Sequence, residues 1–141
     1  MKVALLSREY PPEIYGGAGV HVEYLARELS RQVDLGVYCF GADRKASEVQ
    51  GSYKSWGALD GSAPELAALR TLSIDLAMAK DVAGSELVHT HTWYANFAGH
   101  LAKLMYGIPH VMTSHSLEPL RPWKAEQLGG GYAISSFSER T

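Results

Sequence analysis

Three glycines are the first residues with a clear chemical use. Gly16, Gly17 and Gly19 follow a short apolar run and precede a helical pattern. The start of a helix has unpaired N–H groups and the positive end of the helix dipole, and glycines let an anion approach these amides closely. The Gly-Gly-x-Gly spacing matches neither the nicotinamide fingerprint nor a Walker loop. The group is a candidate phosphate site, with a plain tight turn as the alternative.

Histidines form the second group of interest. His89 and His91 are two residues apart in a strand-like segment, so their side chains point to the same face, and His115 follows the next strand. Three imidazoles could hold zinc, which makes a zinc-dependent hydrolase using these residues one alternative function. No aspartate follows nearby to activate a water, and strand histidines are more often structural, so we predict no metal.

Other side chains near these groups could contact a sugar. His115 stands between Ser114 and Ser116, where it could donate a hydrogen bond to a sugar hydroxyl or to a developing charge. Glu9 lies beside the glycine loop and is either a hydrogen-bond acceptor or a solvated charge. Aromatic residues that could stack on a sugar ring, or simply pack, are Trp93, Tyr94 and Trp123.

Strands and helices that alternate along the chain would position these residues. Apolar periodicity predicts strands at 2–6, 33–40, 87–91 and 108–113, and helices at 22–33, 62–80 and 95–106. Ser62 is expected to cap the second helix, and Gly107 to end the third. The polar stretch 42–61 is expected to be a long excursion with room for short strands. The pattern predicts an α/β fold, with a parallel sheet covered on both faces and a ligand beyond the carboxyl ends of its strands.

Composition narrows the class of protein. The chain has 141 residues, 46% hydrophobic and 20% charged, which fits one globular domain. A formal net charge of −2 argues against a broad nucleic-acid or lipid surface. The single cysteine and the short apolar runs argue against disulfides, a signal peptide and a membrane span, and favour the cytoplasm. The polar helical end at 137–141 lacks a capping glycine, so we expect a truncated domain.

Several segments resemble retaining glycosyltransferases of the GT-B fold, and most closely glycogen synthases of the actinobacterial type. The resemblance runs from Lys2 to Thr141 except for the variable middle, and the segments that carry it are Arg8–Glu13, Tyr15–His21, Val88–Asn96, Thr113–Pro119 and Arg121–Tyr132. It implies that residues 1–141 form the Rossmann-like, acceptor-side N-terminal half of such an enzyme. The C-terminal nucleotide-sugar domain would then be absent, and the fragment alone inactive.

The resemblance also implies an activity and roles for individual residues. The enzyme would transfer glucose from a nucleotide sugar such as ADP-glucose to an α-glucan such as glycogen, with no cofactor and no protein nucleophile. His115 would lie beside the transferred sugar as the catalytic residue, and Gly16, Gly17 and Gly19 would bind the donor phosphates. Residues expected to bind the sugar or the acceptor are Glu9, His91, Thr92 and Trp93.

Two positions depart from the family pattern. Ile14 stands where many bacterial glycogen synthases have lysine, and Thr92 stands where many have aspartate. We therefore expect neither a cationic contact from residue 14 nor a carboxylate role at residue 92. A stand-alone sugar- or nucleotide-binding α/β module is the non-enzyme alternative.

Overall fold

A five-stranded parallel sheet forms the centre of the protein. The computed structural model describes residues 1–117, 120–121, 123 and 130–140. Its strands have the order β3-β2-β1-β4-β5, and each neighbouring pair is parallel. They are β1 (Lys2–Ser7), β2 (Asp34–Phe40), β3 (Gly51–Tyr53), β4 (Leu87–His91) and β5 (His110–Thr113). The expected α/β fold, with a Rossmann-like parallel sheet, is confirmed.

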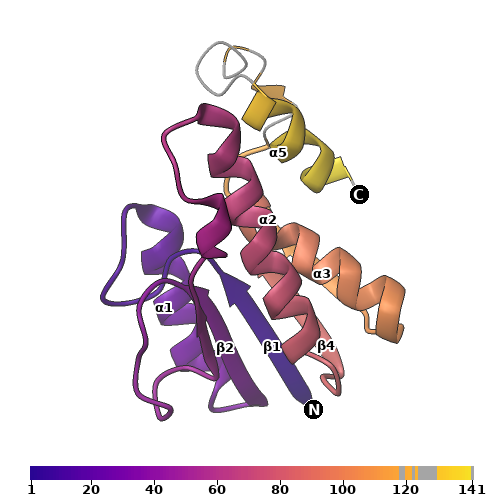
Figure 1. Ribbon diagram of the computed structural model, residues 1–141. Helices are drawn as coiled ribbons and strands as arrows, with labels where there is room; N and C mark the ends of the chain where they lie inside the picture. The colour runs from indigo at the N-terminus through magenta and orange to yellow at the C-terminus, as the bar shows by residue number, and fades with distance from the viewer. Residues whose placement is uncertain (118–119, 122, 124–129, 141) are drawn as a thin grey trace.

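Helices cover both faces of this sheet. Figure 1 shows α1 on one side of the sheet and α2 on the other, with α3 beside α2. A further helix, α5, packs on α2 and α3. The helices are α1 (Gly17–Leu29), α2 (Pro64–Asp81), α3 (Trp93–Tyr106) and α5 (Gly130–Arg140), with a short 3-10 turn, η1 (Gly57–Leu59), before α2. None of the described helices combines the length and the hydrophobicity that crossing a bilayer requires.

Two apolar clusters hold the helices to the sheet, and β1 contributes to both. Leu6 packs with α2 and α3, whereas its neighbour Leu5 packs with Val22 and Ala26 of α1. Both leucines have no exposed surface. Successive side chains of a strand point to opposite faces, so a strand buried on both sides must be apolar throughout. This explains the continuous apolar run at the start of the chain.

Several element boundaries differ from the predictions, among them the start of α3, which lies at Trp93 instead of residue 95. Ser62 is not the N-cap of α2, because Ala63 takes that position without a side-chain hydrogen bond and Pro64 opens the helix. Helix α1 begins at Gly17, earlier than its apolar pattern, and ends at Leu29, so that Val33 lies in the turn before β2. Strand β5 begins at His110, two residues later than expected.

Other boundary predictions are confirmed. The polar excursion contains β3 and η1. Gly107 ends α3 with a φ of 69°, a left-handed conformation that glycine adopts without steric cost.

Candidate functional site

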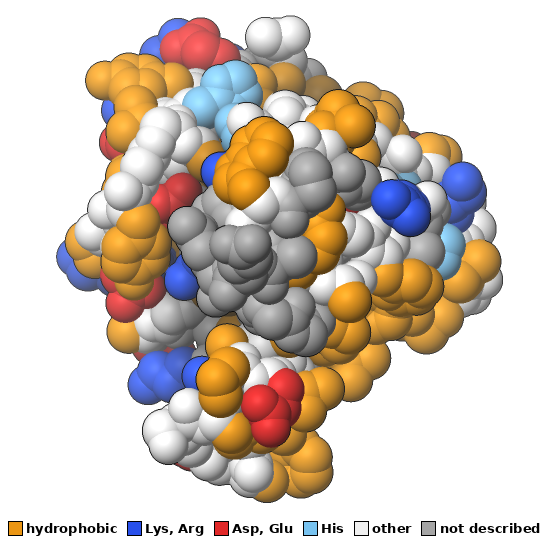
Figure 2. Space-filling view, turned by 90° about the horizontal axis from the view of Figure 1, so that it is seen from above, with side chains coloured by type: hydrophobic (Ala, Val, Ile, Leu, Met, Phe, Trp, Pro, Cys, Tyr) orange, Lys and Arg blue, Asp and Glu red, His pale blue; other side chains and the backbone are white. Residues whose placement is uncertain are grey.

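The strand register brings the functional segments to one edge of the sheet. Ser7 at the end of β1 is paired with His91 at the end of β4, and His91 is paired with Thr113 at the end of β5. The segments that follow these strands therefore leave the sheet side by side. Figure 2 looks onto this end of the molecule and shows histidine surface beside hydrophobic surface.

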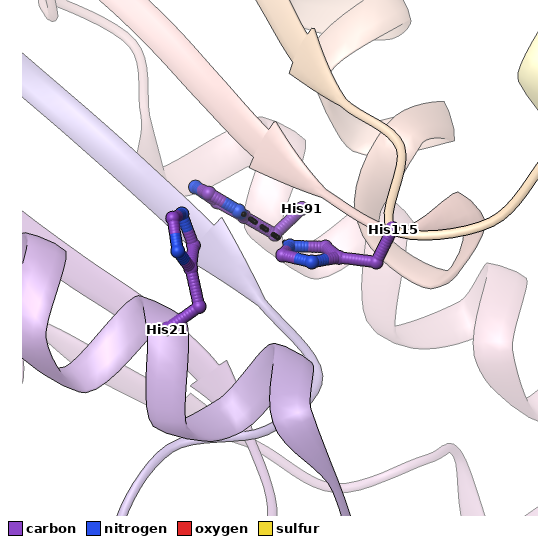
Figure 3. Close-up of side chains that lie close together, drawn as sticks. All are labelled: His21, His91 and His115. Carbon is purple, nitrogen blue, oxygen red and sulfur yellow. Dashed lines mark hydrogen bonds between the residues drawn. The ribbon is translucent and has the colours of Figure 1, made fainter.

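Three histidines from three different elements meet at this edge. His21 comes from α1, His91 is the last residue of β4, and His115 follows β5. Their ring centroids lie 5.2 to 5.7 Å apart. Figure 3 shows the three rings turned toward one another, and a hydrogen bond of 3.1 Å joins His91 Nδ1 to His115 Nε2. The structure therefore places the expected catalytic residue, His115, in contact with a buried imidazole.

Burial lowers the pKa of His91 and of His115, which keeps these two imidazoles neutral near pH 7. His91 has no exposed surface, and burial, reinforced by His89 and His115, lowers its pKa from 6.5 to about 3. The pKa of His115 is also lowered, first by burial and then by His21, with Glu9 acting in the opposite direction. A neutral imidazole has one nitrogen that donates a hydrogen bond and one that accepts. His91 and His115 can therefore keep the hydrogen bond between them and still offer their other ring nitrogens to a ligand.

Unsatisfied polar atoms and backbone strain mark the same place. His91 Nε2 and Thr92 Oγ1 are buried and have no hydrogen-bond partner among the described residues. Thr92 also has a φ of 65°, which for a β-branched residue costs on the order of 1–3 kcal/mol. Strain and unpaired polar groups of this kind concentrate where a ligand binds.

The glycine loop is open on one side and tightly packed on the other. A Cβ added to Gly16 or Gly17 would meet nothing within 4 Å. At Gly19 it would lie 2.9 Å from Glu9 Cβ and 3.0 Å from Ile14 Cγ2. The Glu9 carboxylate accepts a hydrogen bond from the Tyr15 N–H and so closes the loop. Gly16 and Gly17 leave room for an anion at the N-terminus of α1, whereas Gly19 permits close packing.

A hollow of about 290 Å³, here called the glycine-loop hollow, lies beside this loop. The first turn of α1 itself has no acidic residue, and the Glu9 carboxylate that lines the hollow accepts a hydrogen bond from the Tyr15 N–H. The walls of the hollow include Ser7, Arg8, Glu9, Gly16, Thr92 and Tyr94. Three of the predicted site residues, Glu9, Gly16 and Thr92, therefore share one cavity.

A second hollow of about 510 Å³, here called the arginine hollow, lies next to it. Arg8 and Tyr94 line both hollows. Trp93 lines the arginine hollow, where its ring stacks on Tyr94 with centroids 4.3 Å apart. Of the expected sugar and acceptor residues, Glu9 and Thr92 line the first hollow and Trp93 lines the second, whereas His91 lines neither.

The histidines that could bind a metal differ from the set expected from sequence. One ring nitrogen each from His21, His91 and His115 lies within 4.8 Å of the others. His89 does not join them, because its Nε2 is hydrogen-bonded to Thr113 Oγ1 at 2.7 Å. A metal at the assembled set would compete with the bond between His91 and His115.

Sequence reasoning missed some residues of this region. It places His21 with His91 and His115 among the candidate histidines at the ligand end of the sheet, but it gives no chemical role to His21, Arg8 or Arg70. Nothing in the local pattern at Arg70 points to a site, because its position depends on how α2 packs. Much of the 121–132 segment that carries the resemblance lies outside the described residues, as do Glu118, Pro119 and Thr141.

Comparison with known proteins identifies the relatives of this chain. The model of the family described as Glycosyltransferase Family 4 matches residues 15–141. Alpha-maltose-1-phosphate synthases of Mycolicibacterium smegmatis and of Mycobacterium tuberculosis are each 55% identical to this chain over 141 residues. These matches cover 100% of this chain and 35% of each relative, so the chain spans about a third of the length of the curated relatives it matches.

A solved structure supports the fold. Sucrose-phosphate synthase from Thermosynechococcus elongatus superposes with a TM-score of 0.64 at 16% identity, over 96% of this chain and 39% of that one. At this identity the likeness concerns the fold alone.

Proposed function

The chain belongs to glycosyltransferase family 4, and from this membership we propose that it forms the acceptor-side part of a retaining glucosyltransferase. The enzyme takes glucose from a nucleotide sugar such as ADP-glucose. The observation that carries the proposal is the meeting of the glycine loop and the histidine segments at one edge of the sheet. Gly16 and Thr92, the neighbour of His91, line one hollow. The ring centroid of His21 from α1 lies 5.2 Å from that of His115.

The acceptor follows from the chemistry of the relatives. Their name states a product, maltose 1-phosphate, which contains two glucose units and one phosphate. A single glucosyl transfer gives this product only if the acceptor is glucose 1-phosphate. We therefore propose glucose 1-phosphate as the acceptor. An α-glucan such as glycogen is the second candidate, supported by the resemblance of the 88–96 and 113–119 segments to glycogen synthases.

Four of the described site residues have a role in this proposal. The amides of Gly16 and Gly17 stabilise the leaving diphosphate with the positive end of α1. His115 donates a hydrogen bond to the glucose that is transferred, and His91 holds its ring in place. The leaving phosphate takes the proton of the incoming hydroxyl on the same face of the sugar, so the new bond keeps the α configuration.

The glycine-loop hollow agrees with a mechanism that has no protein nucleophile. A double displacement through the protein needs two carboxylates about 5 Å apart. Among the described residues that line the hollow, Glu9 is the one carboxylate, and it is hydrogen-bonded to the Tyr15 N–H. Without a protein nucleophile, the protein would catalyse the transfer by positioning the two substrates and by stabilising the charge that develops between them.

Further expectations complete the proposal. A C-terminal domain would supply most of the nucleotide-sugar site, so residues 1–141 alone would be inactive. The enzyme would work in the cytoplasm, where the buried thiol of Cys39 stays reduced. Family membership favours this transferase over the zinc hydrolase and over the stand-alone binding module.

A transfer assay tests the function. The protein as its gene encodes it is incubated with ADP-, UDP- or GDP-glucose, and with either glucose 1-phosphate or glycogen. We expect an α-linked disaccharide phosphate from the first acceptor, and no product from a chain that ends at Thr141. The absence of transfer to either acceptor, or a β-linked product, would contradict the proposal.

A further inference from the structure

The arginine hollow has the size and composition of a binding site. It lies between the N-terminal half of α2 and the starts of α3 and α5, beside the ends of β1 and β2. Its volume of about 510 Å³ falls within the roughly 300–1,000 Å³ typical of small-ligand pockets. The walls include Arg8, Phe40, Arg70, Thr71, Trp93 and Tyr94. The hollow therefore combines two cations with stacked aromatic rings.

The charge of this hollow is positive, although the chain as a whole has a formal net charge of −2. The described residues that line it include two arginines and no aspartate or glutamate. Arg8 has no hydrogen bond or ion pair with any described residue. Its guanidinium lies 4.2 Å from the centroid of the Tyr94 ring and 5.6 Å from that of Tyr15. The rings orient this cation and leave its N–H groups available.

Arg70 is anchored at one end only. Its Nη1 donates hydrogen bonds to the carbonyl oxygens of Leu59, at 3.0 Å, and Gly61, at 3.3 Å. No described residue accepts a hydrogen bond from its Nε or Nη2. A guanidinium held in place with donors to spare is well suited to bind a phosphate, because its planar fork matches the geometry of the anion.

The position of Arg8 relates the two hollows. Its side chain lines both, so the arginine hollow is separated from the glycine-loop hollow by a shared wall. A phosphorylated acceptor must bring a hydroxyl to the transferred sugar and keep its phosphate away from the donor diphosphate. The arginine hollow borders the glycine-loop hollow through Arg8 and Tyr94 and is not lined by Gly16 or Gly17, and the Trp93 and Tyr94 rings offer a surface for the acceptor's sugar ring.

We propose that the arginine hollow binds the acceptor, with Arg70 and Arg8 holding its phosphate. Resting on the proposed function, this inference adds the residues that select a phosphorylated acceptor. Arg70 is the discriminating residue, because it lines the arginine hollow and not the glycine-loop hollow.

Arg70→Gln in the full-length protein tests the assignment. We expect the KM for glucose 1-phosphate to rise at least about tenfold, because a charge-assisted contact is lost, while the KM for the nucleotide sugar stays within about twofold. The rate of glucosyl transfer to unphosphorylated glucose should be the same in Arg70→Gln as in the wild type. Inorganic phosphate should compete with the acceptor in the wild type and much less in the variant. Arg31→Gln, which removes an exposed arginine from the turn after α1, is the control for charge.

The outcomes separate the two proposals. A wild-type protein that does not use glucose 1-phosphate overturns the proposed acceptor and this inference with it. A wild type that uses it, beside an Arg70→Gln variant with unchanged preference for the phosphate, overturns the inference alone. The inference is also overturned if Arg70→Gln reduces transfer to glucose 1-phosphate and to unphosphorylated glucose equally, or if it raises the KM for the nucleotide sugar instead. Arg70→Lys, which keeps the charge, should restore part of the preference.

Discussion

His91 and His115 share a hydrogen bond of 3.1 Å between Nδ1 of the first and Nε2 of the second, although 24 residues separate them in the chain. His91 is fully buried, whereas His115 is exposed. The buried ring of His91 therefore fixes the orientation of the His115 ring, which a ligand can reach. The contact exists because β4 and β5 are neighbours in the sheet. It is the geometric basis for the role that we propose for His115.

Replacement of His115 tests that role directly. We expect His115→Ala to reduce turnover at least about tenfold, which corresponds to a loss of roughly 1.4 kcal/mol of transition-state stabilisation. Turnover is measured at saturating substrate in the full-length protein. His100→Ala, which removes a partly exposed imidazole from α3, is the control and should retain activity. Unchanged turnover in His115→Ala would contradict the assignment.

The buried imidazole of His91 makes stability depend on pH. Its pKa of about 3 lies below the 6.5 of a free imidazole, so protons favour the unfolded chain between these values. As the pH is lowered through this window, His91 alone should reduce the free energy of unfolding by about 1.4 kcal/mol per pH unit. His91→Gln cannot be protonated, so its stability relative to the wild type should rise by about 2 kcal/mol between pH 7 and pH 5. Urea denaturation of both proteins at pH 7 and pH 5 measures this difference. Stabilities that change with pH in the same way in the variant and in the wild type would contradict the prediction.

The three glycines of the loop should respond differently to alanine. Gly16→Ala and Gly17→Ala have space for the new methyl group, so we expect stability within about 0.5 kcal/mol of the wild type. If the amides bind a phosphate, the same two variants should raise the KM for the nucleotide sugar. Gly19→Ala places a methyl against Glu9 and Ile14 and should destabilise by about 1–3 kcal/mol. Thermal and urea unfolding, measured beside activity, separate these effects. A fully stable Gly19→Ala would show that the loop is not tightly packed.

Asp75 of α2 has a buried carboxylate outside the site. It has no exposed surface, neither oxygen has a hydrogen-bond partner among the described residues, and burial raises its pKa. Its stabilising contribution is therefore present at low pH and lost as the pH rises through the raised pKa. We expect Asp75→Asn to be more stable than the wild type at pH 8 by about 1–3 kcal/mol, with a smaller difference at pH 4.

A second aspartate on the same helix provides the control for Asp75. Asp81 accepts a hydrogen bond of 2.7 Å from Tyr53 Oη and pairs with Lys80. Asp81→Asn should not stabilise the protein at pH 8. If Asp75→Asn proves destabilising at that pH, the Asp75 carboxylate has a compensating partner.

Metal removal tests the histidine cluster. The proposed transfer uses no metal at His21, His91 and His115, so treatment with a chelator should leave activity unchanged. Added Zn²⁺ should inhibit, because one ring nitrogen from each of these three residues lies within 4.8 Å of the others, so that together they can ligate the ion and draw His115 from the sugar. His21→Ala should weaken that inhibition. Loss of activity on chelation, restored by zinc, would favour a metal-dependent reaction instead.

Local pattern was sufficient for most of the secondary structure. Gly107 ends α3 as expected, because the residue type that tolerates a positive φ is visible in the sequence. Ser62 did not cap α2 because a capping pattern does not fix which of two adjacent residues takes the cap conformation. Asp75 could not be foreseen, since its helical position alone does not show that α2 buries it.

Periodicity and turn residues act over a few positions, so local pattern predicts the alternation of strands and helices, the glycine loop and the segments that leave the strands. The assembled fold was needed to show that His21, and not His89, contributes the third ring nitrogen beside His91 and His115, and that Arg8 and Arg70 line one hollow. These contacts join residues tens of positions apart, and they depend on strand order, register and helix packing, which no local pattern records.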